Sequence, residues 1–549
     1  MAEHSACRNG QRIAFLLGDS AAQRIPSPRP GGFPVSTILK PIPADFPWNE
    51  RNARHLLNRA GFGVPYSSVA TLLRMGAADS VKSLVNYDKY PDSIVEPEFS
   101  DLDAQEMEVR ESMKDLEPEE RLKKTRELQR LQREEVESLK SWWIDQMGRT
   151  PRPLQEKMTL FWHGHFATSA EKVKQAQSNY ELNKVFRTNA TGNLKTLVFE
   201  VGKSAAMLRY LDNNQNRKGH PNENWSRELM ELFTLGIGHY TEDDIKEAAR
   251  AFSGYTDRRG QFTFVANQHD YGSKTFLGQT GDFDGADIIN IIFQQPQAAR
   301  FISKKLWEFF VYENPSEQLV EELATILRAN DFELKPLLSA IFLSHEFYGE
   351  KAMAGQIKSP AQYVVMMMDQ LQFKPDKRLL VNLALRGLGQ DLFYPPNVKG
   401  WPGNRAWINT NTLLMRYNIS AYVVLGERPQ GKRELRLDET EMNGQIVNQE
   451  TGERRARAER QLAARRRSAL RDVSKIYAPY EGRTVAEAVD GVVNHFIGRP
   501  IGRAQRAQLA EVLMPGASGT GKFSYAEAGR EKSAATLHLI MSMAEYQVC

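Results

Sequence analysis

The chain has 549 residues, of which 41% are hydrophobic and 26% are charged, and its formal net charge at pH 7 is +4. This composition is typical of a soluble globular protein with roughly one to three domains, and so small a net charge does not by itself favour nucleic acid as a partner. The two cysteines, Cys7 and Cys549, cannot build a disulfide framework, and without an apolar run of about 18 residues no transmembrane helix is expected.

Residues 1–47 are predicted to form a disordered leader, because the sequence is rich in Pro, Gly and Ser from residue 20 onward. The apolar run at residues 13–17 is shorter than the core of about 7 to 15 residues that a secretory signal needs. As written, the sequence therefore predicts a cytoplasmic protein.

Residues 48–426 are predicted to form a large helical domain, because apolar residues recur there at helical spacing. Within it, residues 104–146 are dense in Glu, Lys and Arg, which predicts a charged helical hairpin insert whose second helix starts at Pro118. A coiled-coil site for a partner is the alternative for this insert. The next helix is expected to end near Trp162. Further helices are predicted over residues 171–189, 193–209 and 222–235.

Local signals between residues 241 and 277 predict one more helix and the only β structure. Thr241 and Asp244 form an acidic variant of the capping box, which marks a helix start. The buried face of this helix is expected to contain Ile245, Ala248, Ala249 and Phe252. One small β-hairpin insertion follows, in which residues 262–266 pair with residues 274–277. Apart from that insertion, the fold class is predicted to be mostly α.

The C-terminal part is predicted to contain a basic connection and a helical module. Residues 427–475 are low in apolar side chains and contain an arginine-rich tract at 454–471, which indicates a linker or an exposed helix. A contact arm for phosphate or for an acidic partner is the alternative. Because no aromatic residues are interleaved with the arginines, nucleic-acid binding by base stacking is not expected. Residues 476–549 are predicted to form a helical module that packs on the main domain.

The helix predicted over residues 222–235 carries a polar stripe next to its apolar face. The stripe contains Asn224, Arg227, Glu228 and Glu231. Half-buried carboxylates need a cation, so Glu228 and Glu231 are predicted to bind a metal or to act as a general base, with Arg227 as an orienting charge. The alternative is an Arg227–Glu231 ion pair in solvent.

Two histidines, His163 and His165, flank Gly164 in an aromatic stretch. If the helix ends near Trp162, the pair lies in an extended segment, where residues two apart share one face. That spacing is typical of metal ligands, since imidazole suits Zn, Fe, Cu and Ni. The alternatives are a helix cap combined with packing on Trp162, or acid–base chemistry without a metal.

Further polar groups are predicted to converge on these two stretches. His239 follows the helix closely, His269 and Asp270 lie at the tip of the hairpin, and Lys274 comes just beyond. Such a nitrogen and oxygen ligand set favours Zn, Mn or non-haem Fe. The predicted metal ligands are His163, His165, Glu228, Glu231, His239 and His269. The predicted catalytic residues are Glu228, Glu231, Arg227, Lys274 and Asp270.

An irregular segment at residues 397–409 is predicted to bind substrate. Trp401 and Trp407, together with Asn409, Arg416 and Asn224, are the expected aromatic and polar lining for a sugar, a peptide or an aromatic compound. The alternative is a buried loop whose tryptophans fill core space. Long irregular segments inside compact domains are often functional, which keeps the first interpretation open.

Several motifs resemble, in this order, those of the bacterial domain-of-unknown-function 1800 family. They are residues 52–63, 161–166, 222–236, 238–241, 269–278 and 400–403. The resemblance spans roughly residues 48 to 549, with the leader, the charged hairpin and the arginine tract as variable inserts. It implies a protein of a kind that is often exported and is frequently encoded beside a sulfatase-like or alkaline-phosphatase-like protein, the partner that we therefore expect. The N-terminus departs from the exported pattern, because no convincing signal segment is found there. Three explanations stay open: the protein stays inside the cell, its true start differs, or its export uses another route.

Two functions stay open at this point. The first is a helical enzyme with a His/Glu site, with or without a divalent metal, that acts by hydrolysis or oxidation on a glycan, a peptide or another polymer. The second is a non-catalytic partner or assembly protein in which the polar cluster is a buried network that fixes the fold. The sequence contains no phosphate-binding Walker loop, no His-Glu-x-x-His zinc helix and no Gly-x-Ser-x-Gly elbow.

Overall fold

The protein is built almost entirely from helices, as the spacing of its apolar residues predicts. The computed structural model describes residues 38–549 except 64, 66, 93, 100–116, 354, 372–376, 427–469 and 518–519. In this part of the chain the sheet structure consists of two small antiparallel sheets of two strands each. The mostly α fold class is confirmed, with two hairpin insertions in place of one.

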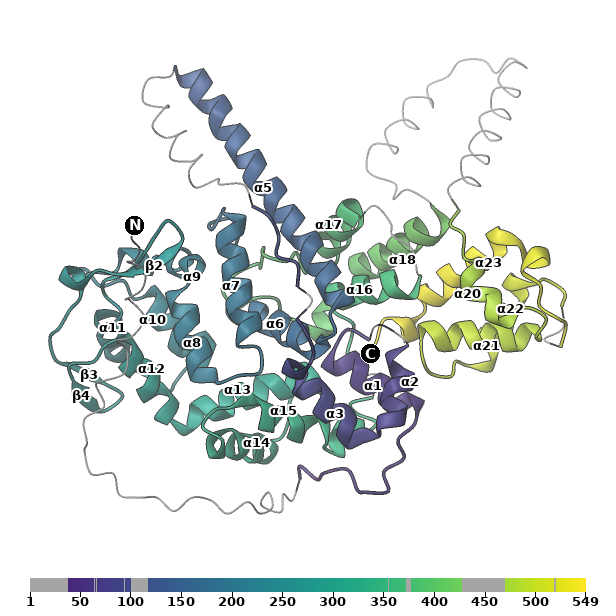
Figure 1. The fold of residues 1–549 in the computed structure, drawn as a ribbon, viewed down its shortest axis with the longest axis horizontal. Coiled ribbons are helices and arrows are strands. Elements are labelled where there is room, and N and C mark those ends of the chain that lie inside the picture. The colour runs from purple at the N-terminus through teal and green to yellow at the C-terminus, as the bar shows by residue number, and fades with distance from the viewer. Residues whose placement is uncertain are drawn as a thin grey trace, which may run out of the picture. The chain divides into compact units, whose positions relative to one another are not determined.

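The elements follow one another as Figure 1 shows. Those before residue 220 are α1 (Glu50–Ala60), α2 (Ser68–Met75), α3 (Ala77–Val85), η1 (Tyr87–Lys89), α5 (Pro118–Arg149), α6 (Pro153–His165), α7 (Ala176–Thr188), α8 (Leu194–Lys203), α9 (Ala205–Tyr210) and η3 (Asn213–Gln215). Those between 220 and 300 are α10 (Asn224–Glu228), η4 (Leu229–Thr234), α11 (Glu242–Ala251), β1 (Tyr255–Arg258), β2 (Gln261–Phe264), η5 (Ala266–Gln268), β3 (Lys274–Phe276), β4 (Gln279–Gly281), α12 (Gly285–Gln294) and α13 (Pro296–Phe310). The rest are α14 (Glu317–Ala329), α15 (Leu334–Phe342), η6 (Glu346–Tyr348), α16 (Pro360–Gln370), α17 (Lys377–Leu388), η7 (Asn404–Trp407), α18 (Thr410–Leu425), α20 (Ser474–Tyr477), η8 (Ala478–Tyr480), α21 (Val485–Phe496), α22 (Arg503–Leu513), α23 (Tyr525–Ser542) and η9 (Ala544–Tyr546).

Two separate β-hairpins replace the single one that the sequence predicts. β1 pairs with β2, and β3 pairs with β4. In the first hairpin both loop residues, Arg259 and Gly260, have positive φ (53° and 73°), the type I′ geometry that matches the twist of the strands. The predicted pairing of residues 262–266 with 274–277 is therefore wrong, because each strand finds its partner across a two-residue turn.

Helix starts agree with the local sequence signals. Thr241 caps α11 in a capping box with Asp244, and Ile245, Ala248 and Ala249 are buried, as expected. Helix α5 starts at Pro118, the expected first position. The first half of the predicted hairpin insert, from residue 104 to 116, and the arginine-rich tract lie outside the described residues, apart from the end of that tract.

The predicted leader ends earlier than residue 47. Residues 1–37 lie outside the described part, but the segment from Ile38 onward is ordered. Ile42 N donates to Leu343 O at 2.8 Å, and Leu39 N donates to Glu322 Oε2 at 2.9 Å while the Leu39 side chain is buried. The leader prediction is therefore wrong for residues 38–47, because a short apolar run there packs on the core.

Helix α6 lies between two large clusters of buried apolar side chains. Phe161 and Trp162 belong to one cluster and Leu160 to the other. Every residue from Leu154 to His163 is buried. The polar residues of α6 must therefore find partners inside the protein, since an unpaired buried polar group is costly.

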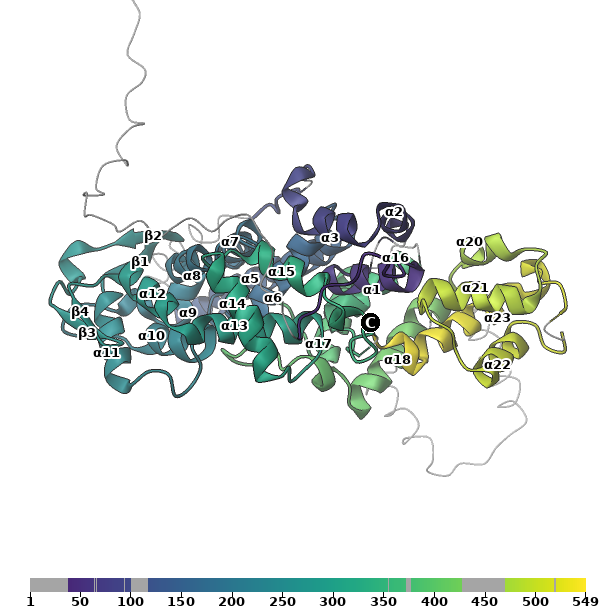
Figure 2. The same ribbon diagram turned by 90° about the horizontal axis from the view of Figure 1, so that it is seen from below.

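The C-terminal helices share a core with the helices before them. α20, α21, α22 and α23 lie together in both views (Figures 1 and 2), and α23 packs on α18. Tyr546 of η9 is fully buried, and its hydroxyl donates to Gln370 Oε1 of α16 at 3.1 Å. Residues 38–549 form one compact unit. None of its described helices is both long and apolar enough to cross a membrane.

Candidate functional site

Helix α6 continues through both histidines, so the prediction that it ends near Trp162 is wrong. Phe166 N donates to Trp162 O at 2.8 Å, the regular helical bond, and His165 is the last helical residue. On a helix, residues two apart point about 200° away from each other. His163 and His165 therefore face different neighbours instead of sharing one face.

His163 accepts a hydrogen bond that stabilises the fold. Its Nε2 accepts a hydrogen bond from Phe393 N at 3.1 Å, and its ring meets the Trp143 ring edge-on at 5.0 Å. Burial lowers the pKa of His163 to about 3. The imidazole is therefore neutral at pH 7 and holds the segment after α17 against α6.

His165 has one ring nitrogen fixed and the other turned toward a lysine. Nε2 lies 3.0 Å from Phe233 O, and because a carbonyl only accepts, Nε2 carries the proton. Nδ1 is then the unprotonated nitrogen, and Lys305 Nζ lies 3.4 Å from it. Burial and the nearby Lys305 charge lower the pKa of His165 well below its usual range. A neutral imidazole therefore turns its unprotonated nitrogen toward Lys305.

Lys305 belongs to an otherwise aromatic stripe of α13. Phe301 and Phe309 lie one turn before and after it, and its Nζ is 4.8 Å from the centre of the Phe301 ring. Its other polar neighbour is Leu232 O, at the long distance of 3.5 Å. Burial lowers the pKa of Lys305 to about 8.

Lys157 is the second lysine in this region, on the face of α6 that also carries Phe161 and His165. Only 6% of it is exposed, and its Nζ donates to Gln362 Oε1 at 2.9 Å. The Phe62 and Phe309 rings lie 5.2 and 5.6 Å from the ammonium. Burial lowers the pKa of Lys157 to about 8.

The segment containing Trp401 lies against α6 and, together with α6 and α13, forms one of three walls of a cavity. A Cβ on Gly400, whose φ is +76°, would lie 2.0 Å from Gly164 O, so only glycine allows this approach to α6. Trp401 then packs over His163 with ring centres 5.4 Å apart. Trp407 is buried, with 6% exposed.

These three walls enclose a cavity of about 460 Å³. Its lining includes Lys157, Phe161, His165, Lys305, Gln362, Gln390, Lys399, Trp401 and Trp407. Two carboxylates also line it: Glu308, whose Oε1 accepts from Asn314 N at 3.3 Å and whose charge acts on Lys305, and Glu313, which lies 3.8 Å from Arg405. The cavity therefore combines aromatic walls with positive charge.

Glu228 and Glu231 lie beyond Lys399, outside the cavity lining. Both are half-buried, and Tyr240 donates to Glu231 Oε2 at 3.2 Å. Burial, and next the charge of Glu231, raise the pKa of Glu228, while Arg227 and Lys399 oppose that rise. The predicted carboxylate pair is thus brought together, but not with the two histidines.

The predicted helix over residues 222–235 changes type in its middle, which breaks the predicted ion pair. After α10, the segment η4 is a π-helix, in which Leu235 N donates to Met230 O. Arg227 pairs with Glu242 at 2.8 Å and with Glu223 at 3.2 Å. The alternative of an Arg227–Glu231 pair is wrong, because the π-turn rotates the residues after 228 away from their α-helical positions.

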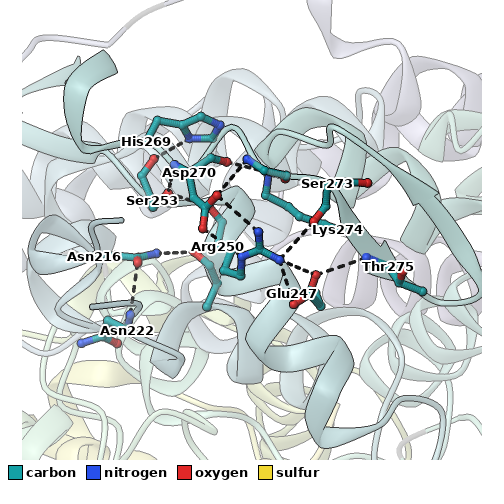
Figure 3. Close-up of polar contacts among 12 residues, drawn as sticks. Asn216, Asn222, Glu247, Arg250, Ser253, His269, Asp270, Ser273, Lys274 and Thr275 are labelled. Carbon is teal, nitrogen blue, oxygen red and sulfur yellow. Dashed lines mark hydrogen bonds and ion pairs between the residues drawn. The ribbon is translucent and has the colours of Figure 1, made fainter. Parts of the chain in front are cut away.

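Asp270, Lys274 and His269 stabilise a loop, as Figure 3 shows. Arg250 Nε donates to Asp270 Oδ2 at 2.9 Å, and this bond lowers the pKa of Asp270 to about 2. Lys274 Nζ donates to Asp270 O at 2.7 Å and Gly272 O at 2.9 Å. His269 Nδ1 donates to Ser253 O at 2.8 Å. This cluster is internally satisfied and is separate from the cavity.

The remaining predicted site residues lie apart from the cavity lining. His239 and Asn224 are exposed. Asn409 caps α18, where its side chain accepts from Thr412 N at 3.0 Å. Arg416 is buried and donates to Lys358 O at 2.8 Å and to Gln547 Oε1 at 3.2 Å. Of the predicted substrate-binding residues, Trp401 and Trp407 line the cavity.

The predicted metal ligands do not fit a divalent cation such as Zn, Mn or Fe. In the described part of the chain no group of three or more His, Cys, Asp or Glu side chains is arranged to hold a metal ion. His163 Nε2 is occupied by Phe393 N–H, and His165 Nε2 by the Phe233 carbonyl. The free Nδ1 of His165 faces an ammonium group, which repels a cation.

Sequence reasoning missed Lys157 and Lys305. The available signal was a lysine on an apolar helical stripe: Lys305 lies between Phe301 and Phe309, and Lys157 lies one turn before Phe161. A lysine in such a place is either paired or functional.

Comparison with known proteins places the chain in one family. No match was found among curated proteins or among solved structures. A family model described as "Protein of unknown function (DUF1800)" matches residues 55–548, which include α6, α13 and the Trp401 segment. The chain therefore belongs to the DUF1800 family.

Proposed function

We propose that this protein binds a negatively charged organic substrate in the cavity between α6, α13 and the Trp401 segment, and acts on it there. One observation carries the proposal: two lysines line the same cavity, and in the described part of the chain neither ammonium group forms an ion pair, although the charge of Cys549 opposes the fall of the Lys157 pKa and that of Glu308 opposes the fall of the Lys305 pKa. Burying a charge without a partner is costly, and a bound anion removes that cost.

Two other buried cations of the same protein, Arg59 and Lys140, show how a structural cation can be satisfied within the chain. Arg59 donates to three backbone carbonyls, including Phe310 O at 3.1 Å. Lys140 pairs with Asp391 at 2.5 Å and with Glu137 at 3.1 Å. Lys157 and Lys305 lack such sets of partners, which supports a role toward a ligand.

The rest of the lining supports an organic ligand with a ring or an extended apolar part. Trp401, Trp407 and Phe161 supply flat apolar surface, and Gln362 and Gln390 supply amide groups. Acidic sugars, acidic peptides and the acidic units of a polymer are ligands of this kind. The unprotonated His165 Nδ1, which lies 3.4 Å from Lys305 Nζ, supports hydrolysis, in which a neutral imidazole takes a proton from water.

Binding is tested with small acids next to their uncharged parents, for example glucuronate and glucose, and sulfated or phosphorylated sugars and their parent sugars. We expect the acids, but not the parents, to raise the melting temperature. Lys157→Met and Lys305→Met should each weaken binding by roughly 10-fold or more, since a hydrogen bond to a charged group contributes about 1.5–3 kcal/mol. Lys304→Met, one residue away on α13, is the matched control. Equal responses to acids and parents would contradict the proposal.

A non-catalytic role as a partner or assembly protein is the second candidate. The Asp270 cluster supports it, because every charged group there is paired within the protein, as a structural network requires. A sulfatase-like or phosphatase-like protein is the partner that the family resemblance suggests. Under this proposal, co-purification with such a partner would be unchanged by Lys157→Met and Lys305→Met. Loss of co-purification in either variant would count against it.

A further inference from the structure

Lys305 differs from an ordinary surface lysine in what surrounds its amine. Phe301 and Phe309 flank it on α13, and the nearest polar atom is His165 Nδ1 at 3.4 Å. The side chain still lines the cavity, so a ligand can reach the amine. Because burial lowers the pKa of Lys305 to about 8, a substantial part of the amine is uncharged just above neutral pH. Only an uncharged amine has the lone pair that attacks a carbonyl.

The partner nitrogen on His165 is held ready to take a proton. The Phe233 carbonyl accepts from Nε2–H at 3.0 Å, which leaves the lone pair on Nδ1 pointing at Lys305. The π-helix that contains Phe233 also supplies Leu232 O, 3.5 Å from the Lys305 amine. An amine beside a neutral imidazole in an apolar cavity is the arrangement of an activated nucleophile.

We propose that Lys305 forms an imine with an aldehyde or ketone group of the acidic substrate, while Lys157 binds the substrate's anionic group. This inference rests on the proposed function, since it uses the same cavity and the same negatively charged substrate. Lys157 is assigned to the anion because its Nζ is fixed by Gln362 Oε1 at 2.9 Å and has no imidazole next to it. Both lysines lie beside the Phe309 ring, so one small molecule can reach both.

The step is neutral in redox terms and uses only groups that the cavity holds. The nitrogen lone pair of Lys305 bonds to the carbonyl carbon, and the carbonyl π electrons move to its oxygen. The oxygen takes the proton that the Lys305 ammonium first passed to His165 Nδ1 and becomes a hydroxyl, and the nitrogen then gives a second proton to His165 Nδ1. The carbon–oxygen bond then breaks, and the hydroxyl leaves as water after taking the proton from His165. The products are a protonated imine and water.

The test uses pyridoxal 5′-phosphate as the probe, because it joins an aldehyde to a phosphate on an aromatic ring. The intact protein is incubated with the probe, reduced with borohydride, digested and mapped by mass spectrometry. We expect modification at Lys305 with an initial rate on the order of tenfold above that at Lys304. Lys305→Arg, which keeps the charge but not the nucleophile, should lose this modification. Lys304→Arg should keep it.

A second probe separates this inference from the proposed function. Pyridoxine 5′-phosphate carries an alcohol in place of the aldehyde, so it tests binding of the anion without an imine. If it binds in a way that depends on Lys157, and pyridoxal 5′-phosphate modifies Lys305 no faster than Lys304, the imine inference is overturned and the binding proposal stands. If neither compound binds and labelling is spread over surface lysines, both are overturned.

Discussion

Single buried polar residues in this protein divide into those with complete sets of partners and those without. His163 Nε2 and Lys274 Nζ are satisfied within the chain, whereas among the described residues Lys157 donates to Gln362 alone and Lys305 makes only two long contacts, with His165 and Leu232. Substituting a residue with a complete set of partners should lower the stability of the fold and leave ligand binding in the cavity unchanged. Substituting Lys157 or Lys305 should weaken ligand binding.

His163 should make stability depend on pH. Its folded pKa of about 3 lies below the unfolded value of 6.5, so only the unfolded chain binds a proton between these values. Stability is therefore complete above pH 6.5 and is lost as the pH falls toward 3, by up to about 1.4 kcal/mol per pH unit for one group. Urea unfolding between pH 7 and 4.5 should show a shallower pH slope for His163→Gln than for the wild type. Equal slopes would contradict the assignment.

Lys274 should act as a structural residue, although the sequence predicts it to be catalytic. Replacing Lys274 with Met removes its hydrogen bonds to Asp270 O and Gly272 O, which should lower the free energy of unfolding by about 1–3 kcal/mol. Binding in the cavity should be unchanged at temperatures where the variant is folded. Lys246→Met, an exposed lysine on α11, is the control. Weaker ligand binding by Lys274→Met would contradict this prediction.

At the scale of elements, α6 makes two contacts that can each be removed by one substitution. One is the approach of Gly400 to Gly164 O. The other is the ion pair in which Arg187 Nε of α7 donates to Glu156 Oε1 at 2.5 Å, with Trp143 Nε1 of α5 donating to Glu156 Oε2 at 2.9 Å. The first positions a cavity wall, and the second holds three helices together.

Gly400→Ala should displace the Trp401 segment. Gly400 and Gly403 have similar positive φ values, +76° and +74°, but a Cβ at 403 would meet no atom within 4 Å. Gly403→Ala therefore measures backbone strain alone, of order 1 kcal/mol. Gly400→Ala should cost clearly more in unfolding free energy and should also weaken ligand binding. Equal effects of the two substitutions on binding would contradict this role of the contact.

Glu156→Ala should be among the most destabilising substitutions in α6. Glu156 is fully buried, and its removal leaves the Arg187 guanidinium without its charge partner, which typically costs about 3–5 kcal/mol. Chemical denaturation measures this loss. The exposed Glu127, paired with Arg130 on α5, is the control, and Glu127→Ala should change stability little. A small effect of Glu156→Ala would show that α6 is held by packing alone.

At the scale of the whole molecule, the C-terminal helices and the main helical region should unfold together. They share one apolar cluster, in which Tyr546 meets Tyr363 with ring centres 5.8 Å apart. Tyr546→Ala should lower the stability of the whole unit by about 3–5 kcal/mol. Calorimetry should show a single unfolding transition, and its melting temperature should be lower in Tyr546→Ala than in the wild type. Two transitions, of which only one moves, would indicate independent domains.

The sequence predicts the fold better than the site, for a physical reason. The capping box at Thr241 and the start at Pro118 are local signals, and the structure follows them. The sequence predicts an end of α6 near Trp162, but Gly164 stays inside the helix, where Gly400, more than two hundred positions away, packs against its carbonyl. The two cavity lysines come from separate helices, and no local sequence pattern predicts that they line the same cavity.

The π-helix η4 has a consequence for the imidazole that it contacts. A π-turn holds one residue more than an α-helical turn in the same rise. Deleting one codon between residues 229 and 234 would restore the α-helical register and rotate the backbone beyond it by about 100°. The carbonyl that now fixes the proton on His165 Nε2 would move away, although every cavity side chain would still be encoded. The tautomer of a residue on one helix is thus set by the number of residues in another.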